Sequence, residues 1–226
     1  MICIICGKNV QKDTFLKHLE SHFYLNKDEI VGYFQELCHP FNVKLHKATC
    51  VDVKNRTIFF SVENAALFIA FAKERFGIDW KKCCEWMALH EKYHIELREF
   101  YEPPNVNYNI ISNVEDYYIE KNMMPEEYKD VCIANARLVV ELRRIMPFSR
   151  KSLVDKDINA YYYMTLAAWH ALGIDFNLKL KSFEWAFIKN VSNLMKEIKD
   201  FKDLPKVMLK ISSLHDFFFE LITKIF

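Results

Sequence analysis

The feature that most constrains the fold is the stretch His90-Glu91-Lys92-Tyr93-His94, which lies in a long run of helical periodicity. On an α-helix, residues four apart lie one turn apart on the same face, so His90 and His94 can both reach a single metal ion. Glu91 would project roughly 100° around from His90, close enough to hold a metal-bound water and accept its proton. This order of residues is typical of zinc hydrolases.

The residues around this stretch predict that both histidines lie in the apolar face of the helix. The apolar residues on the same arc are Cys83, Trp86, Met87, Leu97 and Tyr101. Buried imidazoles need partners, and a metal ion is one such partner. The alternative is a chance match, in which His90 and His94 are core histidines satisfied by hydrogen bonds.

The composition favours a folded, largely helical protein. Apolar residues make up 51% of the 226 residues and aromatic residues 15%, while only four Gly and six Pro occur, which favours long helices over a turn-rich β fold. The formal net charge of +1 gives no electrostatic case for a nucleic-acid or membrane-surface protein. No apolar run approaches the roughly 18 residues of a membrane span, so we expect no membrane partner.

The start of the chain lacks the charged and long apolar regions of a signal peptide. Seven cysteines is an odd count, which is typical of metal ligands and free thiols rather than of a disulfide framework. We therefore expect a cytoplasmic protein.

Residues 1–25 are predicted to form a separate unit with the ligand spacing C-x2-C-x11-H-x3-H. The four residues concerned are Cys3, Cys6, His18 and His22. Four soft ligands in two close pairs suit a closed tetrahedral zinc site. The stretch resembles a C2H2 zinc finger, although its spacer is one residue short and Val10 stands where the family prefers an aromatic residue.

Zinc binding leaves the role of this finger open. Lys8, Lys12 and Lys17 are set against Asp13 and Glu20, which makes a weak phosphate-binding surface. One finger reads about three base pairs and rarely suffices alone. A DNA partner, a protein partner and a structural role are therefore alternatives.

The rest of the chain is expected to be helical apart from one β-hairpin. The β-branched runs 41–53 and 57–62 flank a turn-forming segment, which favours the hairpin. Capping residues are expected to begin two helices, at Asn26 and Asp79, and to end a third, at Gly77. Helices are expected over residues 25–37, 63–76, 79–101, 125–145, 155–172, 176–201 and 204–225, with one more opening near Ser112.

A catalytic zinc ion needs a third protein ligand and an open position for water. The candidates are acidic residues on the helix opening near Ser112, namely Glu115, Asp116 and Glu120. Glu115 lies in the predicted apolar arc of that helix, where a carboxylate needs a cation or several donors. Ser112-x-x-Glu115 also fits a capping box, in which Glu115 only accepts a hydrogen bond from the Ser112 amide. Glu115 as ligand, Glu115 as cap and Asp116 as ligand therefore stay open.

The motif His90-Glu91-x-x-His94, followed about twenty residues later by Asn113-Val114-Glu115-Asp116, resembles the gluzincin metallopeptidases. The resemblance implies a zinc-bound water, a general-base glutamate and a sheet edge that receives extended peptide. It also implies that His90, His94 and Glu115 bind the catalytic zinc, that Glu91 is the base, and that Asp116 orients a ligand histidine.

The predicted fold is α+β and mainly α, with a C2H2 zinc finger over 1–25 and a mostly helical, zincin-like domain over 26–226. A short β-hairpin or sheet precedes the motif helix. Residues 26–122 would form the catalytic core and 123–226 a helical C-terminal part, and the gluzincin likeness spans about 41–122. The predicted function is a metallopeptidase with one structural and one catalytic zinc, acting on a peptide or protein substrate, with the finger for targeting or docking.

Two other classes compete with the peptidase hypothesis. The first is a zinc-finger regulator or adaptor whose second domain binds metal for structure or not at all. The second is a ferritin-like di-metal bundle, which needs a second Glu-x-x-His, here Glu36-x-x-His39. An oxyanion donor could come from Tyr161–Tyr163 or His170, although aromatic packing in the core is the preferred interpretation of those residues. Low glycine with abundant Ile, Lys, Phe and Tyr also resembles proteins of archaeal viruses or plasmids.

Overall fold

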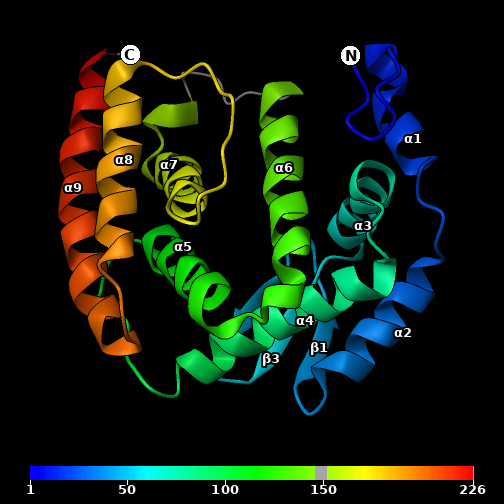
Figure 1. The fold of residues 1–226 in the computed structure, drawn as a ribbon, viewed down its shortest axis with the longest axis horizontal. Helices are drawn as coiled ribbons and strands as arrows, with labels where there is room; N and C mark the ends of the chain where they lie inside the picture. Colours follow the sequence, from blue (N-terminus) through cyan, green and yellow to red (C-terminus); the bar gives the residue numbers. More distant parts are fainter. Residues whose placement is uncertain (146–151, 226) are drawn as a thin grey trace. The chain divides into compact units, whose positions relative to one another are not determined.

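The structure, a computed structural model, describes residues 1–145 and 152–225. These residues are mostly helical and include one small three-stranded sheet (Figure 1). The prediction of an α+β, mainly α protein is confirmed at that level. The chain divides into two compact units, the first comprising Met1–Glu96 and Met124–Met146 and the second Leu97–Met123 and Pro147–Phe226. Ile5 and Phe15 of the predicted finger belong to the same buried cluster as Phe34, Phe68 and Trp86.

The elements of the first unit are η1 (Lys12–Thr14), α1 (Phe15–Glu20), α2 (Lys27–Cys38), β1 (Asn42–Leu45), β2 (Cys50–Asp52), β3 (Thr57–Phe60), α3 (Val62–Phe76), α4 (Trp80–Leu97), η3 (Glu126–Tyr128) and α6 (Lys129–Ile145). Only the last residue of α4 falls in the second unit. The elements of the second unit are α5 (Tyr108–Tyr118), η2 (Ile119–Met123), η4 (Ser152–Val154), α7 (Lys156–Ala171), α8 (Ser182–Lys196), η5 (Phe201–Asp203) and α9 (Leu204–Ile225).

Three helix ends in the first unit lie where the capping residues predict them. The side chain of Asn26 accepts a hydrogen bond from the amide of Asp28 at 3.0 Å, at the start of α2. Asp79 accepts one from the amide of Lys81 at 2.9 Å, at the start of α4. Gly77 ends α3 with a φ of 68°, a left-handed conformation that glycine adopts without steric cost.

The predicted hairpin is confirmed, because β2 pairs antiparallel with β3. The expected strand over 41–53 is instead two strands, since the chain bends after β1, where the amide of Ala48 donates to His46 Nδ1 at 3.2 Å. β1 pairs parallel with β3, with Val43 opposite Ile58. The strand order β1-β3-β2 makes β3 central and leaves β2 at an edge.

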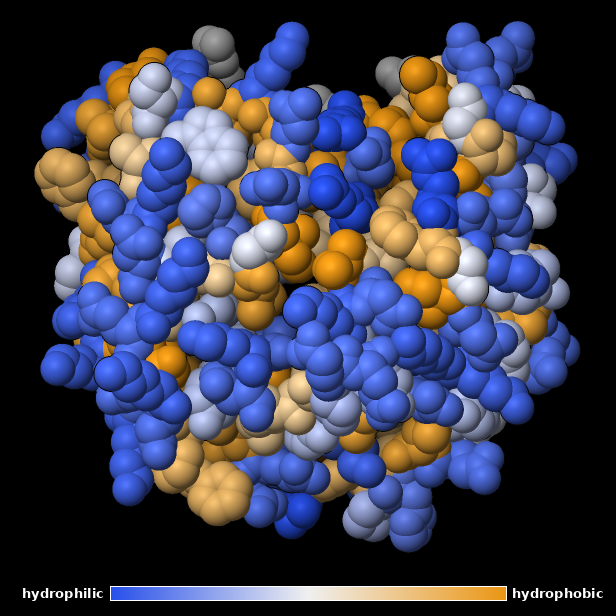
Figure 2. All heavy atoms as spheres, in the orientation of Figure 1, coloured by the Kyte–Doolittle hydropathy of each residue, from blue (hydrophilic) through white to orange (hydrophobic). Residues whose placement is uncertain are grey.

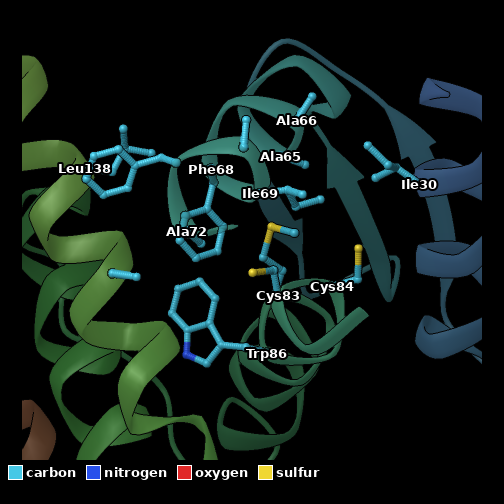
Figure 3. Packing of buried hydrophobic residues seen from close by; sticks show 14 of the residues in the cluster. Ile30, Ala65, Ala66, Phe68, Ile69, Ala72, Cys83, Cys84, Trp86 and Leu138 are labelled. Atoms are coloured by element: carbon cyan, nitrogen blue, oxygen red, sulfur yellow. The ribbon is translucent and has the colours of Figure 1, made fainter. Parts of the chain in front are cut away.

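The core of the first unit lies around α3. Figure 3 shows Phe68 of α3 beside Trp86 of α4, with Leu138 of α6 nearby. The ring centroids of Phe68 and Trp86 are 5.7 Å apart. On the other side, Phe34 of α2 stacks on Phe60 of β3 at 3.8 Å, and both rings are fully buried. The contact between Phe68 and Trp86 packs the helix with the histidine motif against α3.

In the second unit, α7 packs against α5 and α8, and α9 packs against α8. The ring of Phe218 on α9 stacks on Phe187 of α8 at 4.0 Å and meets Tyr163 of α7 edge-on at 4.9 Å. α9 begins and ends where the sequence predicts. Leu221 and Ile225, near its C-terminal end, are exposed.

Polar side chains dominate the face drawn in Figure 2, and hydrophobic ones emerge between them in small groups. Among the helices of the described residues, none has both the length and the apolar character that a membrane span requires.

Candidate metal centres

Cys3 and Cys6 lie in a tight turn near the start of the chain. The amide of Gly7 donates to the Cys3 carbonyl at 2.9 Å, and the Cys3 amide donates to the Lys8 carbonyl at 2.8 Å. Gly7 has a φ of 74°, a left-handed conformation that a residue with a Cβ adopts only with strain. The turn lets both thiols face one point.

His18 lies in α1, and His22 follows just after the helix, with its amide donating to the Leu19 carbonyl at 3.1 Å. The Nε2 atoms of the two histidines are 3.3 Å apart. Burial and the charge of His18 lower the pKa of His22, which favours the neutral imidazole that binds metals.

The structure brings all four predicted finger ligands together, with their ligand atoms within 4.8 Å of one another. Cys3 Sγ lies 3.5 Å from His22 Nε2, and Cys6 Sγ lies 3.4 Å from His18 Nε2. Ligands bound tetrahedrally to zinc at the usual bond lengths have N···N and N···S separations of about 3.3–3.6 Å. The set is therefore compatible with a bound metal ion, and two sulfurs with two nitrogens are the chemistry of structural zinc. The identity of the ion stays a prediction.

The second predicted pair of metal ligands lies on α4. The Nε2 atoms of His90 and His94 are 3.3 Å apart, and the ring centroids are 5.0 Å apart. His94 is buried and His90 half-buried. The His90 ring packs at 5.5 Å from Trp86, which is itself held against Phe68 of α3. The helix thus fixes both imidazoles on one face, as the spacing predicts.

The charge of Glu91, the predicted general base, acts on two cysteines, Cys50 of β2 and Cys38 at the end of α2. Burial, with a smaller contribution from the charge of Glu91, raises the pKa of Cys50 on β2. Burial also raises the pKa of Cys38 to about 12, with the charges of Lys92 and Glu91 acting on it in opposite directions. Lys92 Nζ donates to the carbonyl of Leu37 at 3.4 Å, near the negative end of the α2 dipole.

Glu115, the predicted third ligand, lies in the second unit and is 2% exposed. Arg98 donates to both of its carboxylate oxygens, with Nη2 3.1 Å from Oε2, and the hydroxyl of Tyr101 donates to Oε1. Burial and the Glu115 carboxylate raise the pKa of Tyr101. The apolar arc predicts that a carboxylate here needs a cation or several donors, but the sequence pattern does not identify Arg98 and Tyr101 as those partners.

The capping-box interpretation of Ser112 and Glu115 is wrong. α5 begins at Tyr108, and the side chain of Asn107 accepts from the amide of Asn109 at 2.9 Å, so Ser112 lies inside the helix. Asp116, the other acidic candidate, follows on the same helix and is half-buried.

The exposure of side chains bears on two further alternatives, the di-metal bundle and the tyrosine oxyanion donor. Glu36 and His39, the second ligand unit that a di-metal bundle would need, are both exposed. Tyr163 is fully buried, and its hydroxyl donates to the carboxylate of Glu184 at the start of α8. Burial and that hydrogen bond raise the pKa of Tyr163. Its place is in the aromatic core of the second unit, the interpretation that its helical spacing favours.

No protein-family model matches this chain, and neither a curated protein nor a solved structure shows significant similarity to it. The likenesses to gluzincins and to C2H2 fingers therefore rest on the sequence motifs alone.

Proposed function

We propose that the chain is a zinc-dependent metallopeptidase in which His90 and His94 bind the catalytic zinc and Glu91 is the general base. The observation that carries this proposal is the 3.3 Å separation of the two Nε2 atoms across one turn of α4. Two imidazoles bound to a tetrahedral zinc have nitrogens about 3.3 Å apart. The proposed location is the cytoplasm, which rests on the cysteine count alone.

Zinc, when bound, would polarise the scissile carbonyl and lower the pKa of a coordinated water toward 7. The carboxylate of Glu91 would accept the proton of the attacking water and later pass it to the leaving amine. Glu91 adjoins His90 in the helix, and its charge contributes to raising the pKa of Cys50 on the edge strand β2.

The edge strand β2 is the proposed place for the substrate backbone. β2 is antiparallel to β3 and pairs with no other strand on its outer side within the described residues. An extended peptide can add to such an edge through main-chain hydrogen bonds. The proposed substrate is accordingly an extended segment of a peptide or protein.

The third ligand is proposed among two adjacent acidic residues of α5, Glu115 and Asp116. The resemblance implies Glu115, but both of its oxygens accept hydrogen bonds from Arg98. We therefore assign the ligand role to Asp116, the acidic residue beside it, and assign Glu115 to the buried ion pair.

The alternative function is a regulator or adaptor in which the histidine pair binds no catalytic metal. The charge of the finger gives only weak support to a nucleic-acid partner, since Lys8, Lys12 and Lys17 stand against Asp13 and Glu20. The discriminating property is whether Glu91 matters for hydrolysis but not for folding.

The test is zinc per chain, by elemental analysis, on wild type and on the double variant His90→Ala with His94→Ala. Wild type should hold two zinc ions and the double variant one, whereas His39→Ala, which removes an exposed histidine, should still hold two. Glu91→Gln should keep two zinc ions and the wild-type unfolding temperature while losing cleavage of a peptide library. One zinc ion in both wild type and the double variant would exclude the peptidase in favour of the adaptor.

A further inference from the structure

Ile4 and Ile5, the two residues between Cys3 and Cys6, are buried. A zinc finger that folds by itself does not require their burial. Ile4 is 3% exposed and Ile5 is 1% exposed, whereas Ile2, just before Cys3, is 63% exposed. Side chains between two chelating cysteines point away from the metal, so another surface must cover them. Ile4 and Ile5 belong to the same buried cluster as residues of α2, α3 and α4.

Contacts from α3 indicate where this covering surface lies. Lys73 Nζ of α3 sits over the ring of Tyr24, 3.7 Å from its centroid, two residues after the last predicted finger ligand, His22. Lys27, at the start of α2, pairs with Glu63 of α3 at 3.1 Å. Tyr24 thus contacts the C-terminal end of α3, and the start of α2 contacts the N-terminal end of α3. Figure 1 shows α1 close to α3.

We propose that the finger is a fixed part of the first unit, docked on α3 through Ile4 and Ile5, and that its metal ion stabilises α3 and the histidine helix behind it. Its partner surface is the chain itself, in place of DNA or a second protein. The path to α4 is continuous, because Phe68 of α3 contacts Trp86, and Trp86 contacts His90. The proposal holds whether or not His90 and His94 bind metal.

The first test follows amide hydrogen exchange of the full chain before and after a chelator removes the finger metal. The background carries His90→Ala and His94→Ala, so only the finger ion is removed. We expect residues 62–96 to exchange at least tenfold faster without the ion, while α7 and α8 keep their protection. Unchanged exchange over residues 62–96 would overturn the proposal.

The second test uses variants that leave all four ligands in place. Ile5→Ala should speed the transfer of the finger zinc to a colorimetric chelator at least fivefold. Lys73→Ala, which removes the α3 side of the contact with Tyr24, should speed it about threefold. Ile2→Ala is the matched control and should leave the rate unchanged. Equal rates for Ile5→Ala and Ile2→Ala would show an independent finger and contradict the proposal.

A DNA-binding role would also overturn it. Fluorescence anisotropy with a random duplex at physiological salt should show no binding that depends on Lys8 and Lys17. Micromolar binding that disappears in Lys8→Ala with Lys17→Ala would assign the exposed side of the finger to nucleic acid instead.

Discussion

The Nε2 atoms of His90 and His94 are 3.3 Å apart, the same separation that the structure gives for His18 and His22 in the finger. The ring centroids are 5.0 Å apart in both pairs. The geometry is what an i, i+4 pair adopts when both imidazoles point at one atom. In the predicted finger, two thiols lie with the histidine pair, whereas the third ligand proposed for the α4 pair is a carboxylate.

Cobalt substitution should therefore distinguish the two centres. With two equivalents of Co²⁺, wild type should show thiolate-to-cobalt charge-transfer absorption from the finger and visible ligand-field bands from both tetrahedral sites. The His90→Ala, His94→Ala variant should lose part of the ligand-field absorption and keep all of the charge transfer. Charge-transfer absorption lost in that variant would contradict the assignment, and Cys3→Ser with Cys6→Ser is the reciprocal control.

The pair Arg98–Glu115 should matter for stability rather than for metal content. Their side chains are only 17% and 2% exposed, so removing the carboxylate leaves a guanidinium in a poorly solvated place. We expect Glu115→Ala to lower the free energy of unfolding of the second unit by about 3 kcal/mol, measured by denaturant titration. Replacing both residues by Met should recover most of that loss.

Two conservative variants on α5 test which acidic residue is the third ligand. Glu115→Gln should keep the second zinc ion, while Asp116→Asn should weaken its binding at least tenfold without a comparable loss of stability. If Glu115→Gln loses the metal and Asp116→Asn keeps it, the ligand is Glu115 and the assignment to Asp116 is wrong.

A buried histidine predicts how the stability of the second unit depends on pH. His215 of α9 is fully buried, with Nε2 3.1 Å from Asn159 Oδ1, and burial lowers its pKa to about 4. The charges of Asp216 and Lys156 act on it in opposite directions. Because the folded state favours neutral His215, the unfolded chain takes up the proton first, so stability is complete above about pH 6.5 and declines as the pH falls toward 4.

The expected loss for His215 over that range is about 3 kcal/mol. It can be measured by urea titrations of the second-unit transition at pH 7 and pH 4.5. His215→Gln keeps a donor for Asn159 and should flatten this dependence. A wild-type slope that persists in the variant would assign the effect to other groups.

Local signals in the sequence predict the helix ends of the first unit well. Asn26, Gly77 and Asp79 cap helices through contacts with residues only a few positions away in the chain, so these caps form as the sequence indicates. The start of α5 differs from the prediction because Ser112 and Asn107 both offer a cap. Burial of Ile110, at 0% exposure, favours the longer helix, and that packing is not visible in local sequence.

The candidate sites divide in the same way. The four finger ligands and the His90, His94 pair follow from spacing along short segments, and the structure brings each set together. The hydrogen-bond donors to Glu115 are Arg98 and Tyr101. A loop separates them from Glu115 in the chain, and the path of that loop depends on tertiary packing. The apolar arc of the helix predicts that Glu115 is buried and needs a hydrogen-bond donor. It does not identify which residue supplies that donor.

Two glycines offer a matched pair of substitutions with opposite expected signs. Gly7 has a φ of 74° in the turn between Cys6 and Lys8, so Gly7→Ala should cost about 1 kcal/mol from backbone strain alone, because no atom lies within 4 Å of the added Cβ. The zinc affinity of the finger should fall about fivefold, which a competitive chelator titration measures.

Gly32 lies inside α2, also with open space around it, and Gly32→Ala should stabilise the first unit by roughly 0.5–1 kcal/mol. Because the finger is proposed to be part of that unit, both changes should shift the same unfolding transition, in opposite directions. A Gly7→Ala variant that alters zinc affinity but leaves the transition of α3 and α4 in place would separate the finger from the unit and contradict the docking proposal.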